Sequence, residues 1–328
     1  MVGRLFTDHR PPTMSPPLLP NQTLTAVPGI SVGHAQDDEA KTGCTVVLGP
    51  FRAAVDVRGL AAGTRQFGAL SPSHLAPQVD GLLLTGGSAF GLAAADGVMS
   101  WLEERGLGLQ TGVARVPIVP SAVIFDLGAG RADRRPDPEM GRAACEAATA
   151  ESVAEGRVGV GCGATVGKLF GSSGAMPGGL GSWAVEFGAH RVAALVVVNA
   201  YGDVLNERGL IIAGARDESG AFVDTAAYLR ARGIPPWTAP QPGTNTTLAV
   251  VATDYPLSRI DLVTLAGQAM NAIVRRIAPA NTQFDGDLVF ACSTAPEPAE
   301  VPAAELLRVG TCAESALARA IERSVAPS

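Results

Sequence analysis

The stretch Gly243-Thr244-Asn245-Thr246-Thr247-Leu248-Ala249-Val250-Val251-Ala252 marks the sharpest change of character in the sequence. The prolines at positions 235, 236, 240 and 242 that precede it predict an irregular, exposed segment. The apolar run that begins after Thr246 predicts a buried strand. A strand buried on both faces needs a covering layer on each side of its sheet, which favours stacked sheets flanked by helices.

The rest of the chain shows the same two kinds of pattern. Short β-branched runs predict strands at 30–32, 45–48, 53–57, 82–85, 122–125, 182–187, 192–199 and 288–292. Apolar spacing predicts helices at 89–104, 139–151, 223–232, 258–277 and 303–325. In the fourth of these helices, apolar residues recur every three or four positions and predict the buried face: Ile260, Val263, Ala266, Met270, Ile273 and Ile277. We expect one compact α+β domain over residues 25–328, preceded by a flexible, proline-rich arm at 1–24.

Composition excludes several classes of protein. The 328 residues carry a net charge of −6 without a basic run or stripe, so the electrostatic footprint of nucleic-acid binding is missing. The longest apolar runs, such as 192–198, fall well short of the roughly 18–20 residues of a membrane span, and the first 20 residues do not read as a secretory signal. The five cysteines are scattered without CxxC spacing. We therefore expect reduced thiols in a cytoplasmic protein, with neither a disulfide framework nor a zinc site.

Lysine is unusually scarce in this chain. Of the 25 basic residues, only Lys41 and Lys168 are lysines. Arginine does not lose its proton at ordinary pH, whereas lysine can, so a lysine that persists against this bias is a candidate for a site that needs a titratable amine. The alternative for Lys168 is a surface lysine without a chemical role.

The sequence gives little support for a phosphate-binding loop or for a catalytic set of Ser, His and Asp. The turn Thr85-Gly86-Gly87-Ser88 lies between a predicted strand and a predicted helix, where it could hold a phosphate. It lacks the Lys-Ser/Thr of a P-loop and the spacing of a dinucleotide motif, so a tight turn is the simpler interpretation. The four histidines are dispersed, and no Ser, His and Asp set has a recognisable spacing.

The junction at Asn245-Thr246 allows two interpretations. It is either a polar turn before a strand or a site of self-cleavage. In the second case the Thr246 hydroxyl attacks the preceding carbonyl carbon, the peptide rearranges to an ester, and water releases an N-terminal threonine. Such a residue carries nucleophile and base together, because an α-amine has an ordinary pKa of about 7.7–8.0.

Several short motifs follow one another in a fixed order: Gly29-Ile30-Ser31-Val32-Gly33-His34, Val55-Asp56-Val57-Arg58-Gly59, Gly86-Gly87-Ser88-Ala89-Phe90-Gly91-Leu92, Ala164-Thr165-Val166-Gly167-Lys168, Asn245-Thr246-Thr247 and Asp285-Gly286-Asp287. In their order and spacing the chain resembles the DmpA-type L-aminopeptidase/D-esterase family over residues 29–325. These self-processing hydrolases include β-peptidyl aminopeptidases and 6-aminohexanoate (nylon) oligomer endohydrolases. The resemblance implies the αββα sandwich of the DmpA/ornithine acetyltransferase type.

The resemblance also implies a site. Thr246 would be the nucleophile, released by cleavage after Asn245 into a large chain of residues 1–245 and a small chain of residues 246–328. Lys168 matches the family's active-site lysine, and Asn199 the asparagine that stabilises the oxyanion. Asp285 and Asp287 match an acidic pair; on a strand, residues two apart share a face, so both carboxylates could approach one amine. Exposed turn aspartates, and a strand-ending turn at Asn199, are the simpler alternatives.

The rest of the implied site concerns substrate, cofactor and assembly. Phe125, Gly86 and Gly87 would lie at the substrate pocket, with Phe125 where better-known members have a tyrosine, so that one hydroxyl is lost. The family needs no metal or organic cofactor, acts on small peptides or amides, and assembles as tetramers of processed pairs. The Asp-x-Asp form of the acidic pair is similar to the nylon-oligomer hydrolases, although two residues do not settle specificity.

Two other functions remain open at this stage. An acyltransferase of the ornithine acetyltransferase type would pass the acyl group to an amine instead of water. A non-catalytic small-molecule binding protein would use the turn at 86–91 and would need no cleavage at Thr246.

Overall fold

A computed structural model of the chain describes residues 20–171, 174–238 and 244–326. Of the predicted arm, residues 1–19 lie outside the described residues, as do 239–243 of the predicted irregular segment. The arm was predicted to extend too far. Leu24 is fully buried, its N–H donates to Ser182 Oγ (2.8 Å), and the Thr23 hydroxyl accepts from Val153 N–H. The chain is therefore packed against the sheet before residue 25.

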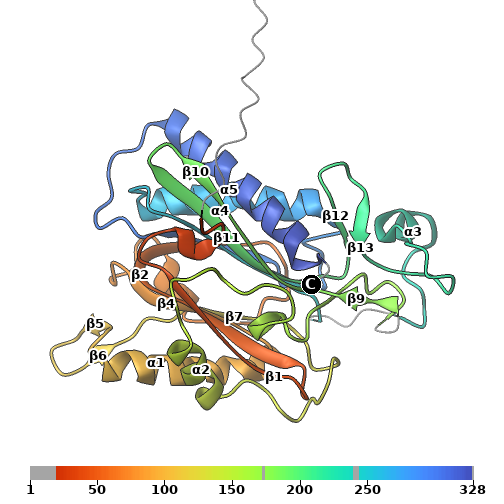
Figure 1. Ribbon diagram of the computed structural model, residues 1–328, viewed down its shortest axis with the longest axis horizontal. Helices are drawn as coiled ribbons and strands as arrows, with labels where there is room; N and C mark the ends of the chain where they lie inside the picture. Colours follow the sequence, from red (N-terminus) through yellow and green to blue (C-terminus); the bar gives the residue numbers. More distant parts are fainter. Residues whose placement is uncertain (1–19, 172–173, 239–243, 327–328) are drawn as a thin grey trace, which may run out of the picture.

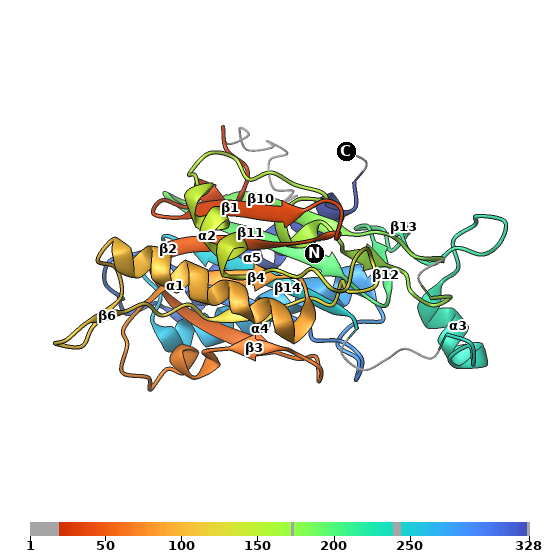
Figure 2. The ribbon, with the colours of Figure 1, turned by 90° about the horizontal axis from the view of Figure 1, so that it is seen from below.

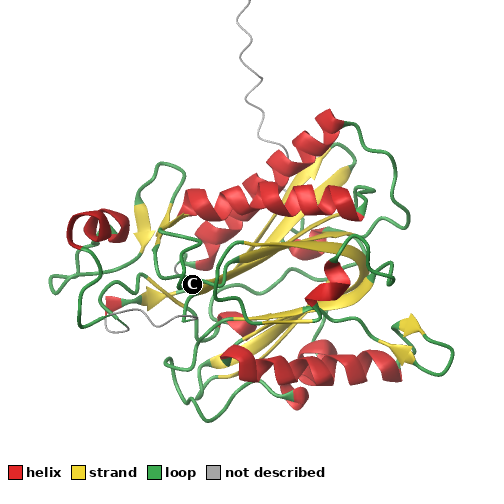
Figure 3. Cartoon of the chain, turned by 180° about the vertical axis from the view of Figure 1, so that it is seen from behind, coloured by secondary structure: helices red, strands yellow, loops and turns green. Residues whose placement is uncertain are grey.

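The molecule is built in four layers, with two layers of strands between two layers of helices (Figure 1). Figure 3 shows the same arrangement from behind, with helices on the two outsides and strands between them. The first strand layer contains, in spatial order, β10 (Gly179–Phe187), β11 (His190–Asn199), β14 (Thr246–Thr253) and β16 (Leu288–Ser293). The αββα sandwich expected from the sequence is confirmed.

The long strand β2 (Thr42–Val57) belongs to both strand layers. Its second half, Arg52–Val57, pairs with β16 in the first layer. Its first half pairs with strands of the second layer, which contains β1 (Ser31–Asp37), β4 (Val79–Thr85), β7 (Ser121–Val123) and β3 (Thr64–Arg65). Because one strand runs through both layers, they form a continuous, strongly bent sheet.

Side chains of alternating residues fill the cores between these layers. Alternation along a strand places neighbouring residues on opposite faces, so in β14 Val250 packs between the two strand layers whereas Val251 packs under the helices. The residues that fill the space between the strand layers include Phe51, Leu82, Leu195, Leu248 and Phe290, all fully or almost fully buried. This explains why the strands are apolar on both faces.

Two long helices, α4 (Arg259–Arg276) and α5 (Ala303–Ser324), cover the first strand layer. The predicted buried face of α4 was partly wrong. Ala266, Met270 and Ile273 are buried, but Ile260 is 70% exposed and Val263 41% exposed. The helix instead buries a neighbouring stripe: Leu262, Leu265, Ala269 and Ala272. Because α4 packs against both the sheet and α5, its buried face is broader than one stripe and centred on different residues.

The second strand layer is covered by α1 (Ala94–Glu104) and α2 (Pro138–Glu146). The predicted helix at 89–104 begins instead as a 3-10 helix, Ser88–Ala93. A Cβ built on Gly97 would lie 1.8 Å from Pro138 O, and one on Gly141 2.0 Å from Ala94 O. The two helices cross with their backbones almost in contact, which a larger residue at either glycine would prevent.

The remaining elements are short. Beside β12 (Asp203–Leu205) and β13 (Ile211–Ala213), α3 (Thr225–Arg232) lies at one end of the molecule (Figure 2). The others are β5 (Leu109–Gln110), β6 (Arg115–Val116), β8 (Thr165–Val166), β9 (Met176–Pro177), β15 (Ile277–Ala278) and 3-10 turns at Leu24–Ala26, Phe67–Leu70 and Gly159–Gly161. Within the described ranges, no helix is both long and apolar enough to cross a membrane.

Candidate active site

The start of β14 is the point where distant parts of the chain meet. β14 runs antiparallel to β11 and parallel to β16, so its first residue adjoins the last residue of β11 and the segment that enters β16. In this register Thr246 pairs with Asn199, and Asn245 forms a parallel bridge with Asp285. Strand direction and register together therefore bring together residues that are far apart in the sequence.

The peptide bond between Asn245 and Thr246 is buried and closely held. Thr246 is 3% exposed and Asn245 1% exposed. The Thr246 hydroxyl lies 2.5 Å from the carbonyl oxygen of Asn245, to which it donates a hydrogen bond. The N–H of Gly286 donates to the same oxygen at 2.9 Å. A hydroxyl group thus lies directly beside the carbonyl group that precedes its own residue.

Lys168, in the loop after β8, contacts Asn199 and Thr244, the residues beside this peptide bond. Its ammonium group donates to Asn199 O (3.0 Å), Asn199 Oδ1 (2.9 Å) and Thr244 O (3.4 Å). Three acceptors match the three hydrogens of an ammonium group. Burial lowers the pKa of Lys168 to about 7, against the negative charges of Asp285, Asp126 and Asp287, which raise it. The lysine that stood out in the sequence is therefore poised to titrate near neutrality.

Asn199 is fully buried at the end of β11, and its amide group has fixed partners. Its Oδ1 accepts from Lys168 and from Thr165 N–H (3.1 Å), and its Nδ2 donates to Phe125 O (3.1 Å). The side chain thus ties Lys168 to Phe125, the second residue after β7. Among the described residues, its Nδ2 donates to Phe125 O and not to the Asn245 carbonyl.

The two aspartates are buried, not exposed in a turn. Asp285 is 1% exposed and Asp287 2% exposed. They lie in the loop before β16, so the expectation that they share one face of a strand was wrong. They converge because the loop folds around them. Asp285 accepts from Thr282 N–H and its hydroxyl, and Asp287 accepts from Thr247 N–H (2.6 Å) and Asn281 N–H (2.8 Å).

The electrostatics of this acidic pair oppose ionisation. Burial raises the pKa of Asp285 above its ordinary value, while hydrogen bonds from Thr282 and the Lys168 charge lower it. Burial, and then the charge of Asp285, raise the pKa of Asp287. Two neighbouring buried carboxyl groups do not easily lose both protons. The pair can therefore hold a proton close to neutral pH, next to the amine of Lys168.

A cavity of about 420 Å³ opens beside Asn245 and Lys168. Phe125 lines this cavity, whereas Gly86 and Gly87 are not among its described lining residues. The lining residues are Phe125, Asp126, Gly128, Ala129, Arg157, Gly163, Thr165, Lys168, Gly171, Tyr201, Thr238, Thr244 and Asn245.

The two glycines instead support Asp126. The Asp126 carboxylate accepts from Gly87 N–H (2.7 Å) and from the Thr42 hydroxyl (2.7 Å), and a Cβ on Gly86 would lie 2.1 Å from it. Burial raises the pKa of Asp126 to about 6. The glycine turn is therefore a structural cradle for an acid at the cavity, not a phosphate loop.

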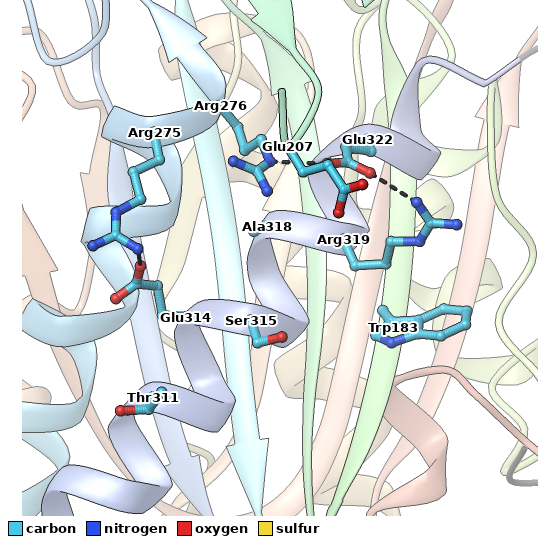
Figure 4. Close-up of a pocket in the computed structure, with 10 residues that line it drawn as sticks. All are labelled: Trp183, Glu207, Arg275, Arg276, Thr311, Glu314, Ser315, Ala318, Arg319 and Glu322. Atoms are coloured by element: carbon cyan, nitrogen blue, oxygen red, sulfur yellow. Dashed lines mark hydrogen bonds and ion pairs between the residues drawn. The ribbon is translucent and has the colours of Figure 1, made fainter. Parts of the chain in front are cut away.

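A second, larger cavity lies elsewhere. Its volume is about 820 Å³, and it lies over the outer side of α4 and α5 next to Trp183 (Figure 4). Arg276 and Arg319 both pair with Glu322 (2.9 and 2.8 Å), and Arg275 pairs with Glu314. It shares no lining residue with the cavity at Thr246. Since its charges largely neutralise one another, it offers no comparable chemistry.

Sequence reasoning missed three parts of the site. Asp126 directly follows Phe125, but nothing in the sequence shows that the glycine turn would hold it. Tyr201 follows Asn199 by two positions and lines the cavity with its buried hydroxyl unpaired. Gly286 lies between the two aspartates, and its contribution is a backbone N–H, which no residue pattern reveals. In the described parts of the chain, no three His, Cys, Asp or Glu side chains cluster as metal ligands would.

The chain is similar to several known proteins. The model of peptidase family S58 matches residues 22–328. An uncharacterized aminopeptidase of Mycobacterium leprae (strain TN) is 41% identical, with 92% of this chain and 89% of the relative covered. A 6-aminohexanoate-oligomer endohydrolase of Kocuria sp. (strain KY2) is 36% identical, with coverages of 81% and 73%.

The fold has a close counterpart among solved structures. The L-aminopeptidase D-Ala-esterase/amidase of Ochrobactrum anthropi, described as a variant of the Ntn hydrolase fold, superimposes with a TM-score of 0.71 at 22% identity. The match covers 92% of this chain and 85% of that one.

Proposed function

This chain belongs to peptidase family S58 and is a hydrolase of amide bonds, and we propose that it is a self-processing enzyme whose nucleophile is Thr246. One observation carries the proposal: the Thr246 hydroxyl lies 2.5 Å from the carbonyl oxygen of Asn245, inside the protein. A hydroxyl held beside its own preceding carbonyl needs little rearrangement to attack it.

Cleavage would create the working nucleophile. Attack by Thr246 Oγ on the Asn245 carbonyl carbon forms an ester, and water then releases Asn245 as a carboxylate. The freed α-amine of Thr246 accepts the hydroxyl proton during later turnovers. A substrate amide is attacked in the same way, an acyl-enzyme forms, and water hydrolyses it.

The neighbouring groups have distinct parts in this proposal. Lys168 places a positive charge beside Thr244 O and orients Asn199. Asp285 and Asp287 shape the loop beside Thr246, and burial raises the pKa of both carboxyl groups, so they provide sites for proton exchange. Asn199 acts by holding Lys168 in position. No step of this scheme requires a metal ion or an organic cofactor.

The cavity supports a small peptide or amide as substrate. Its volume of about 420 Å³ falls within the roughly 300–1,000 Å³ of small-molecule sites. Asp126 and Arg157 place one acidic and one basic group at its wall, which suits a short chain with both an amine and a carboxylate. The Kocuria relative is named for 6-aminohexanoate oligomers, compounds of this kind, so we include ω-amino-acid oligomers among the proposed substrates.

Assembly and location are part of the same proposal. We expect processed pairs to form a homo-oligomer, which light scattering after size-exclusion chromatography measures directly. The five cysteines are all free thiols, four of them buried, as a reducing cytoplasm would keep them.

Denaturing electrophoresis with intact mass and N-terminal sequencing tests the proposal. We expect two fragments, one of which begins at Thr246. Thr246→Ala should stay in one piece without activity, and Thr246→Ser should retain some processing. Thr253→Ala, the same change at the buried far end of β14, is the matched control and should still be cleaved. An active enzyme that remains a single chain would refute the proposal.

Turnover of a peptide and 6-aminohexanoate-oligomer panel by the cleaved enzyme then defines the substrate. Lys168→Ala should lower this activity by roughly tenfold or more; a general acid–base group typically contributes about 10²–10⁴-fold. Product formation that depends on an added amine would indicate acyl transfer instead of hydrolysis.

A further inference from the structure

The backbone of Gly286 contacts the bond that the proposed self-cleavage breaks. Its N–H donates to the Asn245 carbonyl oxygen at 2.9 Å. We propose that this N–H is the group that stabilises the oxyanion formed when Thr246 attacks that carbonyl. The inference rests on the proposed self-cleavage, and for that step it assigns to Gly286 the part that the family resemblance implied for Asn199.

The electron movements show where such a donor acts. Thr246 Oγ forms a bond to the Asn245 carbonyl carbon, and the carbonyl π electrons move to the oxygen. The carbon–nitrogen bond then breaks as the oxygen re-forms its double bond, and the hydroxyl proton ends on the nitrogen of Thr246. The net change is an isomerisation of amide to ester, which water later hydrolyses. Negative charge develops on one atom, the oxygen that Gly286 contacts.

The other candidate donors are engaged elsewhere. Asn199 Nδ2 donates to Phe125 O, and Lys168 donates to Thr244 O and to Asn199. In the described part of the chain, the hydrogen bonds to Asn245 O come from Gly286 N–H and from the Thr246 hydroxyl itself. The hydroxyl is consumed in the attack, so the N–H is the donor that remains on the oxygen.

The loop around Gly286 is fixed from both sides. Ala61 N–H donates to Asp285 O (2.9 Å), and the N–H groups of Arg58 and Gly59 donate to Asp287 O (3.0 and 3.1 Å). The Asp287 carboxyl group is held in turn by Thr247 and Asn281. A donor fixed before the reaction needs no reorganisation when charge develops, which is the physical basis of oxyanion stabilisation.

The absence of a side chain at Gly286 is consistent with its proposed role in stabilising the oxyanion. A Cβ on Gly286 would lie 2.9 Å from Thr246 Oγ and 3.1 Å from the Ala62 Cα. A larger residue would therefore push the attacking oxygen or the Ala62 backbone away. Glycine lets the loop approach the nucleophile closely enough for its N–H to reach the carbonyl.

An amide-to-ester replacement tests the donor itself. Incorporation of glycolic acid at position 286 removes the N–H and leaves the shape of the loop. The matched control is phenyllactic acid at Phe284, which removes a donor of the same loop that contacts Thr282 Oγ instead. Self-cleavage of freshly made precursor is followed by intact mass. Loss of one oxyanion donor typically costs roughly 10²–10³-fold in rate, so we expect that loss for Gly286→glycolate and a change of less than about tenfold for the control.

A spectroscopic measurement keeps the inference testable if the ester variant does not fold. In uncleaved Thr246→Ala, where the hydroxyl is gone, the ¹³C-labelled Asn245 carbonyl should absorb in the infrared as a hydrogen-bonded amide. A precursor with the Gly286 ester that cleaves at the normal rate, or a labelled carbonyl that absorbs as unbonded, overturns the inference. A normal chain that never cleaves would overturn the proposed function first, so the two failures are distinguishable.

Discussion

Replacement of Lys168 by methionine should remove a pH dependence of stability that this residue creates. The comparison uses Thr246→Ala as background, so that the chain stays in one piece. Burial lowers the pKa of Lys168 from 10.5 to about 7. Between these values the unfolded chain binds one proton more than the folded chain, so the free energy of unfolding rises with pH. Methionine has a similar length but no proton to release.

The size of this pH dependence of stability follows from the shift in the pKa of Lys168. With a folded pKa of about 7 and an unfolded value of 10.5, the free energy of unfolding should rise by about 2.5 kcal/mol between pH of about 8 and about 10. The window starts above neutrality to limit the contribution of the neighbouring Asp285 and Asp287, whose pKa values burial raises. The Lys168→Met variant should lack this rise. The difference in free energy of unfolding between the two proteins should therefore change by about 2.5 kcal/mol over the same pH range.

Urea denaturation at several pH values measures the difference. Arg157→Met in the same background is the matched control, because Arg157 lines the same cavity and arginine side chains keep their proton over this range. If the difference in free energy of unfolding between Lys168→Met and its parent stays constant over these pH values, the reasoning is refuted. Such a result would mean that the Lys168 ammonium group is solvated in the folded protein and not poised for chemistry.

Three further predictions concern packing and the site's support. Gly97→Ala should lower the free energy of unfolding by about 1–3 kcal/mol, because its methyl group would meet the backbone of α2, and thermal denaturation measures the loss. Asp126→Ala leaves the buried donors Gly87 N–H and Thr42 without their acceptor and should cost about 1–3 kcal/mol per group, as measured in urea; an unchanged midpoint would contradict this. Ile260→Asp should hardly change the melting temperature, whereas Ile273→Asp on the buried side of α4 should lower it strongly; equal effects would contradict the observed helix face.

The sequence by itself determined the layers. Strands that are apolar on both faces, such as 192–199 and 247–252, can be buried only between two further layers, so composition along the chain already predicted stacked sheets with helices outside. Motif order also indicated the family and pointed to Thr246. Both the layered fold and the family were inferred from patterns of neighbouring residues, and these patterns are visible in one sequence without its structure.

The tertiary structure decided how these elements meet. The convergence of Asn199, Thr246 and Asp285 follows from strand pairing, and neither strand direction nor register can be read from a run of apolar residues. The face of α4 depended on its contact with α5, and the part played by the glycine turn depended on Asp126. Gly286 acts through a backbone N–H that every residue except proline possesses. Its contact with Asn245 exists because folding places the Gly286 nitrogen 2.9 Å from the Asn245 carbonyl oxygen, a proximity that no local pattern encodes.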